Sequence, residues 1–551
     1  VDEWTVADAP PLTGQGGFEI VASERSDAPQ LTVPPDMAVC GDCLAELFDP
    51  ADRRYRYPFI NCTQCGPRYT IIRALPYDRP NTTLAGFPLC PDCEAEYTNP
   101  LDRRFHAQPL ACPVCGPSLT FRCGDECATG NEPALARAIE RIAAGDVLAV
   151  RGVGGYHLIC DARDEAAVSR LRARKRRPHK PLAVMVPMRG GDGLDAAREL
   201  AGLEPAVAAR LADPERPIVL ARLRPHSGLA EGIAPGLNEV GLMLPYTPLH
   251  HLLLGELDRP VVATSGNLSG EPVLTDPDQA ERRLAGVADA FVHHDRPIQR
   301  PADDPVWRFN AGDVRPIRLG RGNAPLELEL PADVGAPTLA VGAFLKNTVA
   351  LAWKKRVVIS PHIGELDSPR AVDVFGQVVA DLQALYGVAG ERIACDAHPD
   401  FPNSRWARDS GLSVQRVFHH EAHASGLCGE FDRLDRDTLV LAWDGVGYGR
   451  DGSMWGGEAL LGRPGRWRRV ASLRPFRLPG GDKVIRQPWR TACSLAWHGG
   501  FDWPGAPDVD PLLRRAWETG LASPWTSAAG RLFDGAAALA GVAGEASYEG
   551  Q

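Results

Sequence analysis

The chain has 551 residues, which is too long for a single hydrophobic core and predicts three or four domains. Acidic residues outnumber basic ones by 70 to 60, and the net charge of −10 argues against a general nucleic-acid-binding surface. Hydrophobic residues make up 44% of the chain, yet no apolar run is long enough to span a membrane. We therefore expect a cytoplasmic protein that binds neither nucleic acid nor membranes.

Residues 1–34 are polar and contain several prolines, and we expect them to form a linker. A cysteine repeat within residues 35–125 follows. Its two frames have the same spacing: Cys40, Cys43, Cys62 and Cys65, then Cys90, Cys93, Cys112 and Cys115. Two C-x2-C pairs complete a closed tetrahedral zinc site. The repeat therefore predicts two structural zinc ions, one per frame, in a module that acts as scaffold and not as active site.

Disulfide bonds are the alternative interpretation of these cysteines. The chain has only 14 cysteines and opens without an apolar signal segment, so a disulfide framework fits poorly. Cys123 and Cys127 follow the repeat with a different spacing, and we interpret them as ordinary thiols.

An α/β domain is predicted for residues 130–325. Apolar residues at helical spacing predict a helix over 134–145 and another over 164–175, with a strand over 146–152 between them. Apolar runs at 181–186, 217–221 and 259–266 are typical of buried strands.

Two polar motifs in this domain favour a nucleotide site. The run RKRRPHKP contains Lys175, Arg177 and Lys180 between a helix and a strand, where cations can neutralise polyphosphate charge. About ninety residues later, Thr264, Ser265 and Asn267 end an apolar strand, where hydroxyl and amide groups can cradle phosphate. A solvated basic helix end is the alternative for the first motif.

A second, larger α/β domain is predicted for residues 335–551. Residues 338–360 are typical of a strand, a glycine turn and a hairpin, and residues 371–387 of a helix. His419 and His423 are spaced to face one way on a helix and to share a metal. Asp444 is expected at a strand end before Gly445 and Gly447, which predicts a carboxylate beside a metal and backbone space for phosphates. A pair of surface histidines is the alternative.

The order of these parts resembles one family. The strings FINCTQCGPRYTI, RKRRPHKPLAVM, ATSGNLSGEP and GGDKVIRQPWR, together with the histidine pair, are similar to the hydrogenase-maturation carbamoyltransferase (HypF) family from about Pro35 onward. The resemblance implies a multidomain α/β protein with a tandem zinc-finger module. It further implies a YrdC-like domain and an actin/sugar-kinase-like (ASKHA) domain.

The resemblance also implies an activity. ATP and carbamoyl phosphate, by way of carbamate, would give carbamoyl-adenylate and pyrophosphate in the YrdC-like domain. The ASKHA-like domain would pass the carbamoyl group to the C-terminal cysteine of HypE, releasing AMP, as precursor of the cyanide ligands of [NiFe]-hydrogenase iron. By residue match, Lys175, Arg177, Lys180, Ser265 and Asn267 would bind nucleotide. His419, His423 and Asp444 would bind a metal (Fe, Mg or Zn) that bridges to nucleotide phosphates; with Lys175 and Arg177 they form the predicted catalytic set.

Two departures from the family pattern lead to further expectations. The acylphosphatase loop G-x-V-Q-G-V-G-F-R is absent, and residues 1–30 resemble only the tail of that domain. The family also continues beyond the final string GEASYEGQ, so we expect a truncated last domain. Formation of carbamoyl-adenylate from supplied carbamate should be the activity best retained.

Three other functions compete with this interpretation. An O-carbamoyltransferase of small molecules would share the two α/β domains, but those enzymes lack the zinc repeat. A tRNA threonylcarbamoylation enzyme fits the acidic charge balance poorly. A zinc-stapled binding scaffold is the non-enzymatic alternative, and release of pyrophosphate would exclude it.

Overall fold

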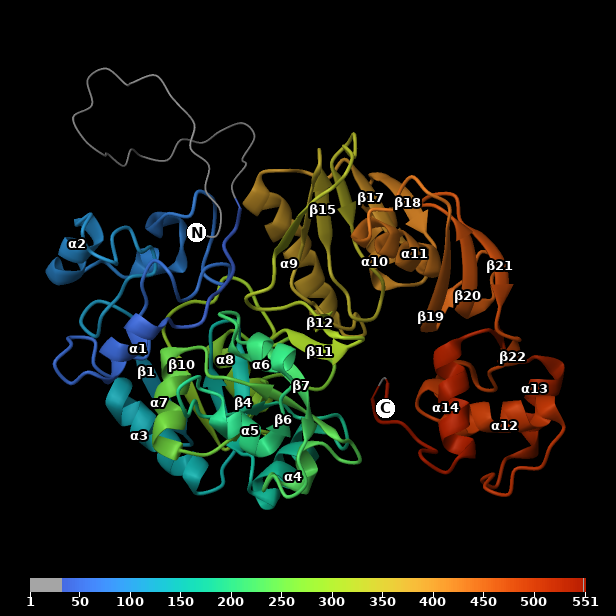
Figure 1. Cartoon of the computed structure of the whole chain (residues 1–551), viewed down its shortest axis with the longest axis horizontal. Coiled ribbons are helices and arrows are strands. Elements are labelled where there is room, and N and C mark those ends of the chain that lie inside the picture. The colour runs from blue at the N-terminus through green and yellow to red at the C-terminus, as the bar shows by residue number, and fades with distance from the viewer. Residues whose placement is uncertain (1–31, 549) are drawn as a thin grey trace.

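The computed structural model describes residues 32–548 and 550–551, which fold into a cysteine module and three units that each have their own sheet (Figure 1). The predicted linker lies outside the described residues except for residues 32–34. Among the helices described, none is both long enough and apolar enough to cross a membrane.

The cysteine module consists of two similar halves. Each half begins with a short helix that starts directly after the first cysteine of its frame: α1 (Gly41–Phe48) and α2 (Pro91–Thr98). Two 3-10 turns, η1 (Arg79–Asn81) and η2 (Thr83–Gly86), connect the halves. The first half packs into the core of the following domain, because Cys43 and Leu47 lie in the same buried cluster as strand and helix residues of that domain.

The predicted YrdC-like domain is built on a twelve-stranded mixed sheet. Its strands are β1 (Leu119–Cys123), β2 (Glu126–Thr129), β3 (Leu148–Arg151), β4 (Tyr156–Asp161), β5 (Val184–Met185), β6 (Ala201–Gly202), β7 (Ile218–Leu223), β8 (Glu239–Met243), β9 (Val261–Ser265), β10 (Ala290–His294), β11 (Val306–Asn310) and β12 (Asp313–Arg318). They lie in the order β12-β11-β7-β8-β5-β9-β4-β3-β10-β1-β2, with β6 beside β7. The sheet takes in residues 119–129, so its first hairpin precedes the expected start at residue 130. Cys123 and Cys127 lie on that hairpin as free thiols.

Helices cover both faces of this sheet. They are α3 (Asn131–Ala143), α4 (Glu165–Lys175), α5 (Asp195–Leu200), α6 (Pro205–Ala212), α7 (Pro248–Leu257) and α8 (Pro277–Leu284), with the 3-10 turn η3 (Glu231–Ile233). One core holds α3, α7 and the cysteine module, and the other holds the remaining four α-helices. The helices predicted at 134–145 and 164–175 correspond to α3 and α4. The second begins where expected because the Asp164 side chain accepts hydrogen bonds from the Ala166 and Ala167 amides.

The next unit is a six-stranded sheet with two helices. Its strands are β13 (Leu326–Glu329), β14 (Thr338–Ala340), β15 (Ala350–Trp353), β16 (Arg356–Ile359), β17 (Arg392–Asp396) and β18 (Ser413–Val417), and its helices are α9 (Pro369–Tyr386) and α10 (Pro402–Asp409). β14, β17 and β18 are parallel neighbours, so their carboxyl ends meet at one edge. The predicted strand, hairpin and helix are β14, β15–β16 and α9. Tyr69 and Ile72 of the cysteine module pack into its core.

The last unit contains a separate five-stranded sheet. Its elements are α11 (His419–Glu430), β19 (Thr438–Tyr448), β20 (Met454–Gly462), β21 (Arg468–Ser472), β22 (Phe476–Arg477), η4 (Gly481–Ile485), α12 (Pro488–Gly499), α13 (Pro511–Thr519), β23 (Trp525–Thr526) and α14 (Ala529–Leu539). Figure 1 shows it beside the six-stranded unit, with α12, α13 and α14 grouped at its far end. The single domain predicted for 335–551 is thus two subdomains, each with its own sheet.

One local prediction is wrong. Asp444 does not follow the end of a strand, because β19 continues to Tyr448. The pairing of β19 with β20 shifts register between Trp443 and Gly447, which makes residues 444–446 an irregular segment inside the strand. A bulge of this kind redirects a side chain out of the alternating pattern, which is how the Asp444 carboxylate reaches helix α11.

Candidate functional site

The eight repeat cysteines form two groups of four, one per frame. Within the first frame, the Sγ atoms of Cys40 and Cys62 are 3.7 Å apart, and those of Cys43 and Cys65 are 3.6 Å apart. The second frame shows the same separation of 3.7 Å between Cys90 and Cys112. A zinc ion held at ~2.3 Å by four tetrahedral thiolates would place the sulfurs about 3.8 Å apart. The cysteines therefore fit two closed structural zinc sites, and no group of metal ligands in the described chain combines the two frames.

The predicted nucleotide residues come together at the carboxyl end of β9. Lys175, the last residue of α4, is only 3% exposed. Its Nζ donates to the Ser265 carbonyl oxygen at 2.6 Å and to the Asn267 carbonyl and Oδ1 at 2.8 and 2.7 Å. Burial, together with the charge of Arg177, lowers the pKa of Lys175 to about 7. The ammonium thus holds the turn that follows β9, in an environment poor in negative charge.

Arg177 and Lys180 lie beside this turn. Helix α4 ends because Arg176 adopts a left-handed conformation, with φ 53°, which turns the chain back across the end of β9. Arg177 then donates to Thr264 Oγ1 at 3.5 Å and to the Pro181 carbonyl. Burial also lowers the pKa of Lys180, and Arg177 and Arg318 add repulsion. We call this set, Lys175, Arg177, Lys180, Thr264, Ser265 and Asn267, the basic cluster.

Sequence reasoning missed the residues that face the basic cluster from elsewhere. Asp303 precedes strand β11, and Arg318 ends the edge strand β12 of the same sheet. The two side chains form an ion pair of 3.4 Å. His362 comes from the six-stranded unit, and its backbone amide donates to the Leu319 carbonyl at 3.2 Å. Burial and the charge of Arg318 lower the pKa of His362 to about 4. The fold of the twelve-stranded sheet brings Asp303 and Arg318 to the cluster, and the packing of the two units brings His362, so no local motif could indicate them.

The histidine pair begins helix α11, as the sequence predicts. His419 Nε2 lies 3.1 Å from His423 Nε2 and 3.0 Å from Asp444 Oδ2. The Asp444 oxygen is buried and makes no well-aligned hydrogen bond despite these neighbours. Donor atoms bound to one metal ion at ~2.1 Å lie about 3.0–3.4 Å apart. The ligand atoms of His419, His423 and Asp444 are spaced as three ligands of one divalent cation would be.

Two further residues complete this histidine cluster. Asp396 ends β17, and its Oδ2 lies 3.2 Å from His419 Nδ1, which fixes the ring. His420 is fully buried, and its Nε2 lies 3.4 Å from Asp444 Oδ2. Asp396 could have been found from the sequence, since the ends of adjacent parallel strands meet at one edge and His419 follows the neighbouring strand. The sequence gives no separate signal for His420, which lies between the two predicted ligands.

The glycines after Asp444 have different surroundings. A Cβ atom at Gly447 would lie 2.6 Å from His420 Cε1 and 2.8 Å from His419 Cβ. Glycine is therefore required there by the close approach of β19 to α11. A Cβ atom at Gly445 would meet nothing within 4 Å, so open space lies beside its backbone. Nucleotide binding by these two glycines stays a prediction.

We expect a divalent cation to displace a proton from this cluster. Burial lowers the pKa of His419, but the hydrogen bond to Asp396 and the nearby Asp444 carboxylate outweigh it and raise the pKa to about 9. His419 is therefore protonated at pH 7.5, and Mn²⁺ binding should release about one proton and strengthen as the pH rises toward 9. Calorimetry in buffers of different ionisation enthalpy measures that number. His423→Ala should abolish the binding, whereas His226→Asn, at an exposed histidine, should not; Mn²⁺ binding without proton release would exclude His419 as a ligand.

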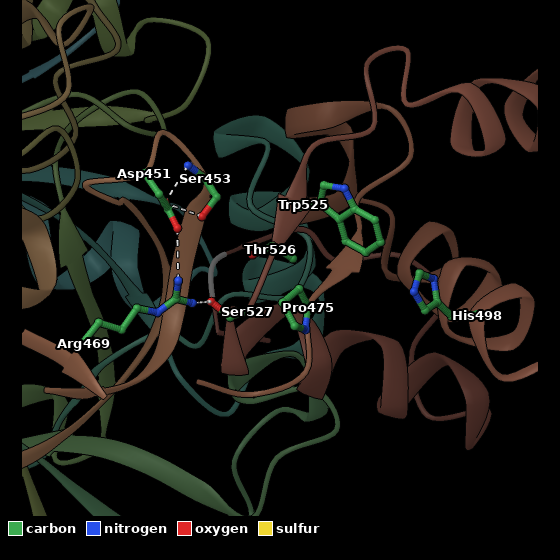
Figure 2. A pocket seen from close by; sticks show the side chains of 8 residues that line it. All are labelled: Asp451, Ser453, Arg469, Pro475, His498, Trp525, Thr526 and Ser527. Atoms are coloured by element: carbon green, nitrogen blue, oxygen red, sulfur yellow. Dashed lines mark hydrogen bonds and ion pairs between the residues drawn. The ribbon is translucent and has the colours of Figure 1, made fainter. Parts of the chain in front are cut away.

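A cavity in the same subdomain is lined by none of the predicted site residues. It has a volume of about 420 Å³ and is lined by Asp451, Ser453, Arg469, Pro475, His498, Trp525, Thr526 and Ser527 (Figure 2). Its charges are matched: Arg469 pairs with Asp451 at 3.1 Å and with Glu458 at 2.5 Å. Because the charged groups already have partners, we place the chemistry at the basic and histidine clusters.

Family models match almost all of the described chain. The HypF finger matches residues 39–72 and 89–122, and the Sua5/YciO/YrdC model, described as telomere recombination, matches 140–320. The HypF Kae1-like domain matches 333–430, and the second subdomain of the carbamoyltransferase Kae1-like domain matches 440–551. These units define a carbamoyltransferase with finger, YrdC-like and Kae1-like parts.

Similar proteins cover the whole arrangement. The carbamoyltransferase HypF of Synechocystis sp. is 46% identical over 98% of this chain and 73% of its own length. The HypF of Rhizobium leguminosarum bv. viciae is 45% identical over 100% of this chain and 71% of its own. A crystal structure of full-length HypF, in a phosphate- and nucleotide-bound form, superposes with a TM-score of 0.93 at 39% identity, over 98% of this chain and 71% of that one. The chain therefore belongs to the HypF carbamoyltransferase family.

Proposed function

We propose that this chain makes carbamoyl-adenylate from ATP and carbamate at the basic cluster. The histidine cluster then serves transfer of the carbamoyl group to the C-terminal cysteine of HypE, for the cyanide ligands of [NiFe]-hydrogenase iron. The observation that carries the proposal is the contact between Lys175 and the Ser265–Asn267 turn. It joins the two motifs that we assign to nucleotide binding, which lie about ninety residues apart in the sequence.

In the first step, a carbamate oxygen attacks the α-phosphorus of ATP. A phosphorus–oxygen bond forms as the bond to the bridging oxygen breaks, and pyrophosphate leaves with the electron pair. Arg177 and Lys180 would neutralise the charge that develops on the leaving group. Lys175 would keep the turn after β9 in place beside the nucleotide.

In the second step, a cysteine thiolate attacks the carbamoyl carbon. A carbon–sulfur bond forms, the carbon–oxygen bond to AMP breaks, and AMP leaves with the electron pair. His419, His423 and Asp444 would hold a divalent cation, whose charge would stabilise phosphate oxygens beside the open backbone at Gly445. Carbamoyl-adenylate hydrolyses easily, so formation and use within one chain limit its loss to water.

Release of pyrophosphate tests the first step. The 551-residue chain should release pyrophosphate from ATP when ammonium carbamate is added, and much less with ATP alone. Absence of pyrophosphate with carbamate would reject adenylate formation by this chain.

The two clusters should separate in a second measurement. We expect His419→Ala to leave carbamate-dependent pyrophosphate release within about twofold of the parent, since the His419 contacts lie in the last two units. Transfer of ¹⁴C-carbamoyl to purified HypE, measured in a full-length HypF that carries the same change, should be lost. Loss of pyrophosphate release in His419→Ala would contradict this division of labour.

A further inference from the structure

A small cavity lies between the cysteine module and the YrdC-like domain. Phe59 of the module closes one side, and Arg151, Tyr246, Thr247, His294 and Arg296 of the domain line the others. Its free volume is about 30 Å³. A single water molecule needs roughly 10–15 Å³ on this measure, so the cavity has room for a few heavy atoms and excludes a nucleotide.

Arg296 is buried in the wall of this cavity without a hydrogen-bonding partner. Its side chain is only 7% exposed, and in the described chain no protein acceptor receives a hydrogen bond from its guanidinium. The ring of Phe59 lies beside it, with its centroid 5.6 Å from Cζ. A guanidinium has five N–H donors, and burying all of them without hydrogen-bond acceptors destabilises the folded state.

Arg151 adds a second cation to the same wall. It is 6% exposed, and one Nη donates to the His294 carbonyl, but its Nε has no partner among the described residues. Burial, together with the charge of Arg151, lowers the pKa of Arg296 to about 10. Two carboxylates lie near Arg296 but form no ion pair with it: Asp295 accepts from the Ser118 amide at 2.8 Å, and Asp36 accepts from the Arg68 amide at 2.7 Å. The described lining of the cavity therefore contains two guanidinium groups and no carboxylate.

His294 supplies a group of the opposite kind. Its Nε2 donates to the Gly152 carbonyl at 2.9 Å, which leaves Nδ1 as an acceptor, and Nδ1 is buried without a partner. A ligand that satisfies this wall thus needs oxygen acceptors for the arginines and an N–H or O–H donor for His294. Carbamate offers two carboxylate oxygens and an amino group, and bicarbonate offers oxygens and a hydroxyl.

The cavity lies at the same edge of the sheet as the basic cluster. Arg151 ends β3 and pairs with Tyr156 at the start of β4, and the next residue, His157, pairs with Ser265 at the end of β9. Two strand spacings separate β3 from β9, which is about 10 Å. The Gly266 amide also donates to the Tyr156 carbonyl at 2.6 Å, so the nucleotide turn rests on the strand beside the cavity.

We propose that Arg151, Arg296 and His294 form a binding site for a small planar carboxylate with an N–H or O–H donor, carbamate or bicarbonate, from which it reaches the basic cluster. This proposal rests on the proposed function and adds to it the place where the small substrate is held. Two buried arginines with no carboxylate partner then have a reason to be there: they pair with the substrate.

The test replaces Arg296 by methionine, which keeps most of the side-chain volume and removes the charge. We expect Arg296→Met to raise the KM for carbamate in pyrophosphate release at least tenfold, and to leave the KM for ATP within twofold. Its melting temperature should be equal to or above that of the parent, because an unpaired buried charge is removed. Arg122→Met, at an exposed arginine on β1, is the control and should change neither KM. An unchanged KM for carbamate, or a fall in melting temperature with loss of activity, would show a structural role and overturn the proposal.

Binding is measured separately with ¹³C-bicarbonate by NMR. The parent chain should bind it, Arg296→Met and Arg151→Met should not, and inorganic phosphate should displace it only weakly. Displacement by phosphate at equal concentration would overturn the assignment to the carbonate class. If the parent releases no pyrophosphate but binds bicarbonate through Arg296, the proposed function fails and the site stands. If the parent releases pyrophosphate and Arg296→Met has the same KM for carbamate, the site fails and the function stands.

Discussion

Replacing Lys175 by alanine is expected to reduce carbamate-dependent pyrophosphate release at least about 100-fold, the scale on which removal of one well-placed cationic or hydrogen-bonding group acts. The Lys175 ammonium makes three hydrogen bonds, at 2.6, 2.7 and 2.8 Å, to the turn that contains Ser265 and Asn267. Without it, the turn loses its anchor and the nucleotide site loses a buried positive charge. The measurement is the initial rate of pyrophosphate release with ATP and carbamate both saturating.

Arg176 offers the matched control for this prediction. It belongs to the same basic run, but it is exposed and its side chain makes no hydrogen bond within the described residues. Arg176→Gln should keep the rate within about twofold, because only general charge is removed. Equal losses in the two variants would mean that the run acts through its total charge, and the specific role of Lys175 would be rejected.

The pKa of Lys175 also predicts how the KM for ATP changes with pH. Burial lowers the pKa of Lys175 to about 7 from 10.5, so the ammonium is lost early as the pH rises. The KM for ATP should therefore increase above pH 7, and this increase should be absent in Lys175→Ala. Between pH 7 and 10.5 the unfolded chain binds the proton that the folded chain has released, so this group makes the free energy of unfolding rise with pH in that window.

Features that depend on local spacing were predictable. The zinc frames require only that two C-x2-C pairs come from tight turns, and the structure places each frame in one group. Helix α11 begins at His419, as predicted, because a strand must end before a helix can start and Phe418 is the extended residue between them. The meeting of Lys175 with Asn267 was anticipated as a shared nucleotide site in one domain, though not the hydrogen bonds that join them.

Features that depend on how strands and units meet were not predictable. The position of Asp444 was missed because a bulge within β19 leaves no signature in the sequence. Arg151 and Arg296 each look like an ordinary arginine near a strand end, and only the fold shows that both face one cavity without a carboxylate. The same holds for His362, which belongs to one unit and lies beside the basic cluster of another.

The second large effect concerns the scaffold. Cys43→Ser should remove one of two zinc ions from the purified chain, because three thiolates and a hydroxyl hold zinc poorly. Structural zinc contributes about 10–16 kcal/mol of apparent binding free energy in small finger peptides. Cys43 is fully buried in the core that the module shares with the YrdC-like domain. We therefore expect a fall in melting temperature above about 10 °C, together with rapid proteolysis of the module. Zinc content by mass spectrometry and the melting curve are the measurements.

Contacts between the two frames should make loss of zinc from the first frame weaken the second zinc site. Arg103 of the second frame donates to Cys43 Sγ at 3.4 Å, and Arg53 of the first frame donates to Cys93 Sγ at 3.1 Å. Arg104 pairs with Glu46 of the first frame, and Arg54 pairs with Glu96 of the second. One cysteine of each zinc site thus accepts hydrogen bonds from the other frame, so unfolding of the first frame removes contacts to the second site. In Cys43→Ser, the remaining zinc should pass to a chelator faster than zinc does from the parent chain. Cys123→Ser, at a free thiol on β1, should retain two zinc ions and the parent rate; an unchanged rate in Cys43→Ser would show that the two sites are independent.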